Sequence, residues 1–242
     1  MKKILILSLS VLSTLLFSAC TDQANQPESQ AENIIGKHTI RFTEPPKRIP
    51  APHSVDAPLL GNGFTGVALS GTPESQVFYV ARNDFWRLKS ALDESFPLVL
   101  GKIELDIPQL KDASYLVEQQ LYDAVSTARF TKGDISVSYK AFVPATEDML
   151  IVDLNMEGNG AVEGSAGISF LGKEEQIDKP PLERIFPDVR EHEMKPNGIE
   201  YLSRAFVDSV DIPTKGAMAL RVSGSTDGIF TLEPEKPVRL GC

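Results

Sequence analysis

Residues Ala57 to Trp86 read A-P-L-L-G-N-G-F-T-G-V-A-L-S-G-T-P-E-S-Q-V-F-Y-V-A-R-N-D-F-W. The stretch joins a glycine-rich turn, from Leu60 to Gly66, to a β-rich run, from Gln76 to Val80. Three glycines within six residues predict backbone conformations that residues with a Cβ resist. The β-rich run leads into a polar cluster that ends in the only tryptophan of the chain.

This cluster consists of Arg82, Asn83, Asp84 and Trp86 and is expected in a loop just after the strand. Guanidinium, amide and carboxylate groups beside an aromatic face are the groups with which proteins bind sugars. The four residues are therefore candidates for substrate binding. The residues are equally compatible with a core tryptophan whose polar neighbours fix the turn, and both interpretations stay open.

The glycines also match the dinucleotide-binding pattern G-x-G-x-x-G, with Asp84 at a suitable distance downstream. That site needs a buried strand before the glycines and a helix after them. Pro58 leaves little room for the strand, and Gly71 and Pro73 would stop a helix within two turns. We therefore predict no dinucleotide site and no cofactor.

The pattern P-L-L-G-N-G-x-x-G, followed by a strand and N-D-x-W, resembles the start of the N-terminal domain of glycoside hydrolase family 95. Members of this family carry a similar glycine motif, which here is Gly61, Asn62, Gly63 and Gly66, and then Asn-Glu-x-x-x-Trp. The shorter second motif of this chain indicates a divergent relative. The resemblance covers the chain from His53 onward, with specific motifs in its first third.

The resemblance implies a galactose-mutarotase-like β-supersandwich from a family of α-L-fucosidases and α-L-galactosidases. The catalytic residues of these enzymes lie in a C-terminal (α/α)6 barrel, and no stretch of this chain is suited to form one. No catalytic residue is therefore assigned, and a missing barrel domain is an expected partner. Residues 238–240 look like the beginning of a further strand, so we expect a sandwich that is incomplete at its C-terminus, with an unpaired edge.

The N-terminus resembles a bacterial lipoprotein signal. Two lysines precede an apolar run that is too short to span a bilayer, and the run ends in L-F-S-A-C. We expect a signal peptide over residues 1–19, a lipid-modified Cys20 and a flexible polar tether over residues 20–36. An ordinary signal peptide with an incidental cysteine is the alternative. Lipidation would place the protein at the outer membrane or cell surface of a Gram-negative bacterium.

The formal net charge of −9 argues against nucleic acid as a partner. With Cys20 lipidated, Cys242 would be the only remaining thiol, so no intrachain disulfide is expected.

From residue 37 to residue 242 the chain predicts one all-β domain, an antiparallel β-sandwich. Short alternating runs are separated by glycine, proline and asparagine turns, and no segment keeps a helical period. The strands expected after the glycine motif are 102–107, 114–122, 125–131, 135–142, 149–156, 167–171, 199–206, 217–223 and 229–232, and residues 39–42 precede it.

Two interruptions, residues 87–100 and 173–197, are predicted to be loops that could reach a ligand or a neighbouring domain. Carboxylates gather at Asp93-Glu94, Glu174-Glu175 and Glu191-His192-Glu193, but no spacing makes them converge, so we interpret them as solvated surface groups. Neighbouring residues on an extended chain point opposite ways, so at most two of residues 191–193 could share a metal ion. The three histidines, His38, His53 and His192, are scattered, and no metal site is predicted.

Taken together, the sequence predicts a non-catalytic β-sandwich module of a cell-envelope glycoside hydrolase that acts in polysaccharide breakdown. A self-sufficient carbohydrate-binding surface lipoprotein is the alternative, and an envelope protein without a ligand is a third hypothesis. The partners expected are a carbohydrate and, through the lipid, a membrane.

Overall fold

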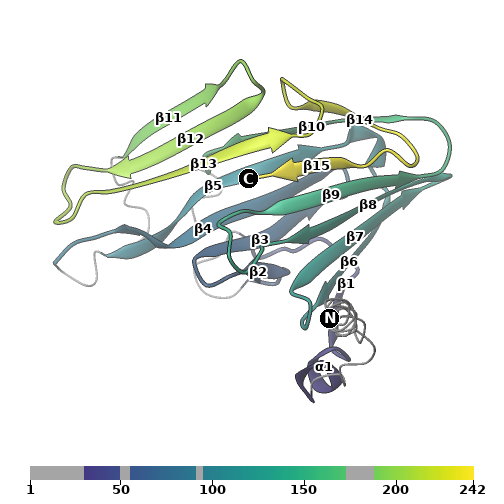
Figure 1. The fold of residues 1–242 in the computed structure, drawn as a ribbon, viewed down its shortest axis with the longest axis horizontal. Coiled ribbons are helices and arrows are strands. Elements are labelled where there is room, and N and C mark those ends of the chain that lie inside the picture. Colours follow the sequence, from purple (N-terminus) through teal and green to yellow (C-terminus); the bar gives the residue numbers. More distant parts are fainter. Residues whose placement is uncertain (1–29, 50–54, 91–94, 173–187) are drawn as a thin grey trace, which may run out of the picture.

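The computed structural model describes residues 30–49, 55–90, 95–172 and 188–242. Within these ranges the chain forms one short helix, one 3-10 turn and a series of β-strands (Figure 1). The elements are α1 (Gln30–Ile35), β1 (Thr39–Phe42), β2 (Leu59–Gly61), β3 (Thr65–Thr72), β4 (Ser75–Arg87), β5 (Phe96–Asp106), η2 (Pro108–Leu110), β6 (Ser114–Gln120), β7 (Val125–Lys132), β8 (Ile135–Phe142), β9 (Ile151–Glu157), β10 (Val162–Ser169), β11 (Val189–Met194), β12 (Ile199–Phe206), β13 (Thr214–Val222), β14 (Ile229–Leu232) and β15 (Val238–Gly241).

The strands form two antiparallel sheets that pack as a sandwich, which confirms the predicted fold class. The larger sheet has nine strands in the order β1-β6-β7-β8-β9-β15-β13-β12-β11. The smaller has six, in the order β14-β10-β5-β4-β3-β2. Figure 1 shows the two sheets face to face, with α1 beside β1.

Apolar and polar residues alternate along the middle strands of the larger sheet, and this pattern explains why these strands form. Along β8, Val137, Tyr139 and Ala141 are buried, whereas Lys140 is exposed. Along β9, Val152, Leu154 and Met156 are buried in the same way. A period of two places one face of each strand in the core and the other in water.

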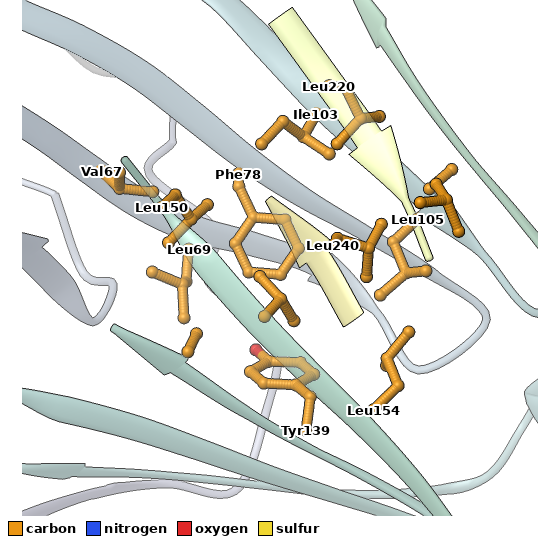
Figure 2. Packing of buried hydrophobic residues seen from close by; sticks show 14 of the residues in the cluster. Val67, Leu69, Phe78, Ile103, Leu105, Tyr139, Leu150, Leu154, Leu220 and Leu240 are labelled. Atoms are coloured by element: carbon orange, nitrogen blue, oxygen red, sulfur yellow. The ribbon is translucent and has the colours of Figure 1, made fainter. Parts of the chain in front are cut away.

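The core fills the space between the sheets (Figure 2). Phe78 of β4 lies at its centre, and its ring meets Tyr139 of β8 edge-on, with the two centroids 5.7 Å apart. The Tyr139 hydroxyl donates to Gln76 Oε1 at 3.2 Å, so the buried phenol has a partner. Burying a side chain such as Phe78 contributes about 1.5 to 3 kcal/mol.

The last strand, β15, lies inside the larger sheet rather than at its edge (Figure 1). Val238 pairs with Leu154 of β9, and Arg221 of β13 pairs with Gly241. The expectation of an unpaired edge at residues 238–240 is therefore wrong, because both sides of this strand are hydrogen-bonded.

Four segments differ from the sequence predictions. The polar cluster at residues 82–86 lies within the long strand β4, not in a loop after it. The expected loop 87–100 supplies the end of β4 and the beginning of β5, and Leu88 forms a β-bridge with Ile212. The expected loop 173–197 contains the edge strand β11, and the residues between Gly66 and Gly71 form the middle of β3.

Several predictions fall outside the described residues. These are the signal peptide, Cys20 and most of the tether, together with His53, Asp93-Glu94 and Glu174-Glu175. The helix α1 lies within the segment assigned to the tether, and none of its residues is buried. Among the described residues, no helix has the length and apolar character needed to cross a bilayer.

Candidate functional site

The candidate site is built on a bulge in β4. Ala81 pairs with Val99 of β5, and the next pair along is Trp86 with Pro97, so four residues of β4 lie opposite the single residue Leu98. The bulge also changes which side chains face inward. Gln76, Phe78 and Val80 are buried before the bulge. Phe85, the last residue of the bulge, and Arg87 beyond it are also buried, so the inward-facing positions change from even to odd numbers. Bulges re-aim side chains in this way and are common beside functional sites.

The glycine-rich turn lies directly against the bulge. Thr65 pairs with Arg82, and the Asn83 amide donates to the Phe64 carbonyl at 2.9 Å. The side chain of Asn83 donates through Nδ2 to the Gly63 carbonyl at 2.5 Å. Turn and bulge therefore form one unit, which we call the turn–bulge surface: residues 61–66 and 82–86.

Asn62 fixes the turn from within and also connects it to the other sheet. Its Oδ1 accepts from the backbone amides of Phe64 and Thr65 at 3.0 and 2.9 Å. Its Nδ2 donates to the carbonyls of Pro144 and Glu147 at 3.2 and 3.1 Å, both in the connection from β8 to β9. All four hydrogen-bonding positions of this amide are thus used.

Arg82 holds the bulge through two carboxylates. Its Nε and Nη2 donate to Asp84 at 2.9 and 3.1 Å, and its Nη1 donates to Asp148 at 2.7 Å. These bonds hold the pKa values of both carboxyl groups below their ordinary range. The same contacts raise the pKa of the guanidinium, so Arg82 stays charged at any physiological pH.

Trp86 is partly exposed, and its indole Nε1 donates to the Asn83 carbonyl at 2.6 Å. The structure therefore brings all four predicted binding residues together, but donors of Arg82, Asn83 and Trp86 are used in internal hydrogen bonds. The polar neighbours fix the turn through these contacts, as the alternative interpretation expects, but Trp86 is partly exposed and is not the core residue that this interpretation also requires. Among the contacts of the described residues, the groups left for a ligand include the Asn83 Oδ1 and its second Nδ2 hydrogen, the remaining lone pairs of Asp84, and the exposed part of the Trp86 ring.

Phe64 is a residue of this surface that the sequence analysis did not single out. It lies at the tip of the turn, and 59% of it is exposed. An exposed phenylalanine beside the exposed Asn83 and Asp84 is the kind of apolar face that stacks on a sugar ring. The signal was available, since Phe64 stands inside the quoted glycine motif.

The motif glycines have different reasons for being glycine. Gly63 has a φ of +94°, a conformation that side chains resist. At Gly61 a Cβ would lie 2.7 Å from the Thr65 carbonyl oxygen, which is too close. Gly66 lies in β3 with nothing within 4 Å of a Cβ, so its backbone does not require glycine. A dinucleotide site needs a helix after Gly66, but the residues that follow Gly66 continue strand β3.

The other titratable candidates lie elsewhere. Glu191, His192 and Glu193 are all exposed on the edge strand β11. Glu191 accepts from Ser203 at 2.7 Å, and His192 Nε2 lies 2.6 Å from Glu200 Oε1. His38 is exposed between α1 and β1. In the ranges that the structure describes, no group of three or more acidic, histidine or cysteine side chains is arranged to hold a metal ion.

Comparison of the sequence with models of known protein families gives no match, and comparison with curated proteins gives none either.

Proposed function

We propose that this chain is the N-terminal β-sandwich module of a cell-envelope glycoside hydrolase, that it contacts carbohydrate, and that it is not catalytic by itself. The antiparallel sandwich agrees with the architecture that the sequence resemblance implies. The observation that carries the proposal is the turn–bulge surface, which presents Phe64, Asn83, Asp84 and Trp86 beside one another.

The chemistry of this surface suits a sugar. The Phe64 ring offers an apolar face, and Asn83 and Asp84 offer acceptors for ring hydroxyl groups. Asn62 holds the backbone of Phe64, Arg82 holds Asp84, and the Gly63 carbonyl holds the Asn83 side chain before a ligand arrives. Such preorganisation strengthens binding, because less conformational freedom is lost when the ligand binds.

A self-sufficient carbohydrate-binding lipoprotein is the second candidate. It is favoured by the fact that every group of the turn–bulge surface belongs to this chain, so a ligand could bind without a further domain. In both cases we propose a lipid anchor on Cys20 at the cell envelope. Mass spectrometry of the mature N-terminus tests the anchor, and an unmodified N-terminus downstream of Cys20 would refute it.

The experiment that tests the function is glycan binding by the full chain. We expect Trp86→Ala and Asn83→Ala each to weaken binding by about 0.5 to 1.5 kcal/mol, the range for one lost aromatic contact or one neutral hydrogen bond. Glu191→Ala on the distant edge strand is the control and should bind as the wild type does. Circular dichroism of each variant shows whether it folds.

Two results would count against the proposal. Unchanged affinity of both folded variants would remove the turn–bulge surface from any sugar site. Hydrolysis of an aryl glycoside by the purified chain at an enzyme-like rate would overturn the statement that the module is not catalytic.

A further inference from the structure

A second candidate site lies on the outer face of the larger sheet. Strands β6 to β9 form a depression of about 330 Å³ there, lined by side chains that include Glu118, Thr127, Arg129, Ser138, Lys140 and Asn155. The volume is at the lower end of the roughly 300 to 1,000 Å³ typical of small-ligand sites. The turn–bulge surface belongs to the other sheet, so the two sites are separate.

The strand register sets the spacing of the polar groups in this depression. Thr127 of β7 lies directly opposite Lys140 of β8, and Ser138 of β8 lies opposite Asn155 of β9. Side chains paired in this way are about 4.5 to 5.5 Å apart at Cβ, and residues two apart on a strand are separated by about 7 Å. Two hydroxyl groups, an amide and an ammonium group therefore share one small area.

The three described carboxylates around this area, Glu118, Asp153 and Glu157, are each paired with an arginine. Glu118 is paired with Arg41 at 2.6 Å, and Glu157 is paired with Arg129 at 2.9 Å. Asp153, which lies opposite Lys140 in the register, is instead held by both Nε and Nη2 of Arg239, at 2.5 and 2.9 Å.

Lys140 differs from these arginines. In the part of the chain that the structure describes, its ammonium has no carboxylate partner, and its one recorded contact is the Phe142 ring, 5.8 Å from Nζ to the centroid. Thr127, Ser138 and Asn155 likewise have no side-chain hydrogen bond to another described residue. The depression thus combines one uncompensated cation with unused hydroxyl and amide groups, on a chain whose net charge is −9.

We propose that this depression binds a saccharide that carries an anionic group, either a carboxylate or a sulfate. Lys140 would pair with the anionic group as a point charge, and the hydroxyl and amide groups would bond the sugar hydroxyls. The saccharide class rests on the proposed function, whereas the anionic group follows from the charges of the depression itself. Diffuse attraction of anions by the whole chain does not explain such binding, because the chain is acidic.

Titration calorimetry on the full chain tests this with three trisaccharides of equal length: an oligouronate, a sulfated one and a neutral one. We expect at least one anionic trisaccharide to bind tenfold or more tightly than the neutral one, with an affinity that falls as salt is raised. The tighter of the two anionic ligands identifies the group. Equal binding of all three, or no anionic binding, would overturn the proposal.

Variants assign the site. Lys140→Gln should weaken anionic binding by roughly tenfold or more, and Thr127→Val by roughly threefold. Lys111→Gln removes the same charge from an exposed position outside the depression and should leave binding unchanged. An unchanged affinity in Lys140→Gln, or an equal loss in Lys111→Gln, would refute the site. Neutral glycan binding that depends on Trp86, without anionic binding, would refute this inference and leave the proposed function intact.

Discussion

The guanidinium of Arg82 and the carboxylate of Asp148 connect the two sheets of the sandwich. Nη1 of Arg82, in the smaller sheet, donates to Oδ2 of Asp148, in the β8–β9 connection of the larger sheet, at 2.7 Å. The same guanidinium holds Asp84 within the bulge. One cation therefore fixes both the local shape of β4 and its position against the neighbouring loop.

This arrangement predicts a pH dependence of stability that Arg82 controls. The hydrogen bonds from Arg82 are the largest cause of the lowered pKa values of Asp84 and Asp148. A carboxyl group whose pKa is lowered by folding stabilises the fold above its unfolded pKa, near 4, and this contribution is lost as the pH falls through the folded pKa. Urea unfolding between pH 6 and pH 2 should show a shallower loss of stability in Arg82→Met than in the wild type.

Arg129→Met is the control for this experiment. Arg129 pairs with the single exposed carboxylate of Glu157 and lies on the outer face of the other sheet. The loss of stability of Arg129→Met between pH 6 and pH 2 should follow that of the wild type. Parallel profiles for Arg82→Met and the wild type would show that Arg82 does not set the acid sensitivity.

Asn62→Ala is expected to destabilise the protein by about 1 to 3 kcal/mol. The substitution removes two acceptor contacts within the turn and two donor contacts to the β8–β9 connection. Asn159→Ala, at an exposed turn position, should change stability by less than about 0.5 kcal/mol. Chemical denaturation measures both, and equal stabilities would mean that the four bonds of Asn62 contribute nothing net.

Much of the fold could be predicted because apolar and polar residues alternate along most strands. The run from Ile135 to Phe142 and the run from Ile199 to Phe206 were predicted with the bounds that the structure has. Strand β3 was missed because Gly66 and Gly71 interrupt its pattern. Strand β11 was missed because it lies at a sheet edge with all residues exposed, so no apolar alternation marks it.

The candidate site could be predicted only in part. Arg82, Asn83, Asp84 and Trp86 were named from their side-chain types, and the structure brings them together. The bulge could not be predicted, because it is defined by the pairing of β4 with β5, which the local sequence does not encode. Asp148 was not found either, since it joins the site only through the packing of one sheet on the other.

The glycines of the motif should differ in their tolerance of alanine. Gly61→Ala places a Cβ 2.7 Å from the Thr65 carbonyl oxygen, so we expect a loss of about 1 to 3 kcal/mol. At Gly66 a Cβ would lie in open space, and the backbone is not left-handed. Gly66→Ala should therefore leave the stability of the protein unchanged or raise it by up to about 1 kcal/mol. Thermal unfolding compares the pair directly. A larger loss at Gly66 than at Gly61 would contradict the geometry.

The thiol of Cys242 should react slowly in the folded protein. Burial is the main cause that raises its pKa to about 12, so little thiolate is present at pH 8. Iodoacetamide labelling followed by peptide mass spectrometry should show modification of Cys242 within the unfolding transition in urea and little in native buffer. Rapid native labelling would show that β15 opens readily at its end.

Phe64→Ala should weaken glycan binding without weakening the fold. The ring is 59% exposed at the tip of the turn, so its removal leaves no cavity, and stability should change by less than about 0.5 kcal/mol. Losing an aromatic contact to a sugar ring should cost about 0.5 to 1.5 kcal/mol in binding. Ile229→Ala is the matched control, because Ile229 is 60% exposed on β14 at the other edge of the same sheet. If both variants bind glycan as the wild type does, Phe64 is an exposed turn residue and the sugar site on the turn–bulge surface must rest on Asn83, Asp84 and Trp86.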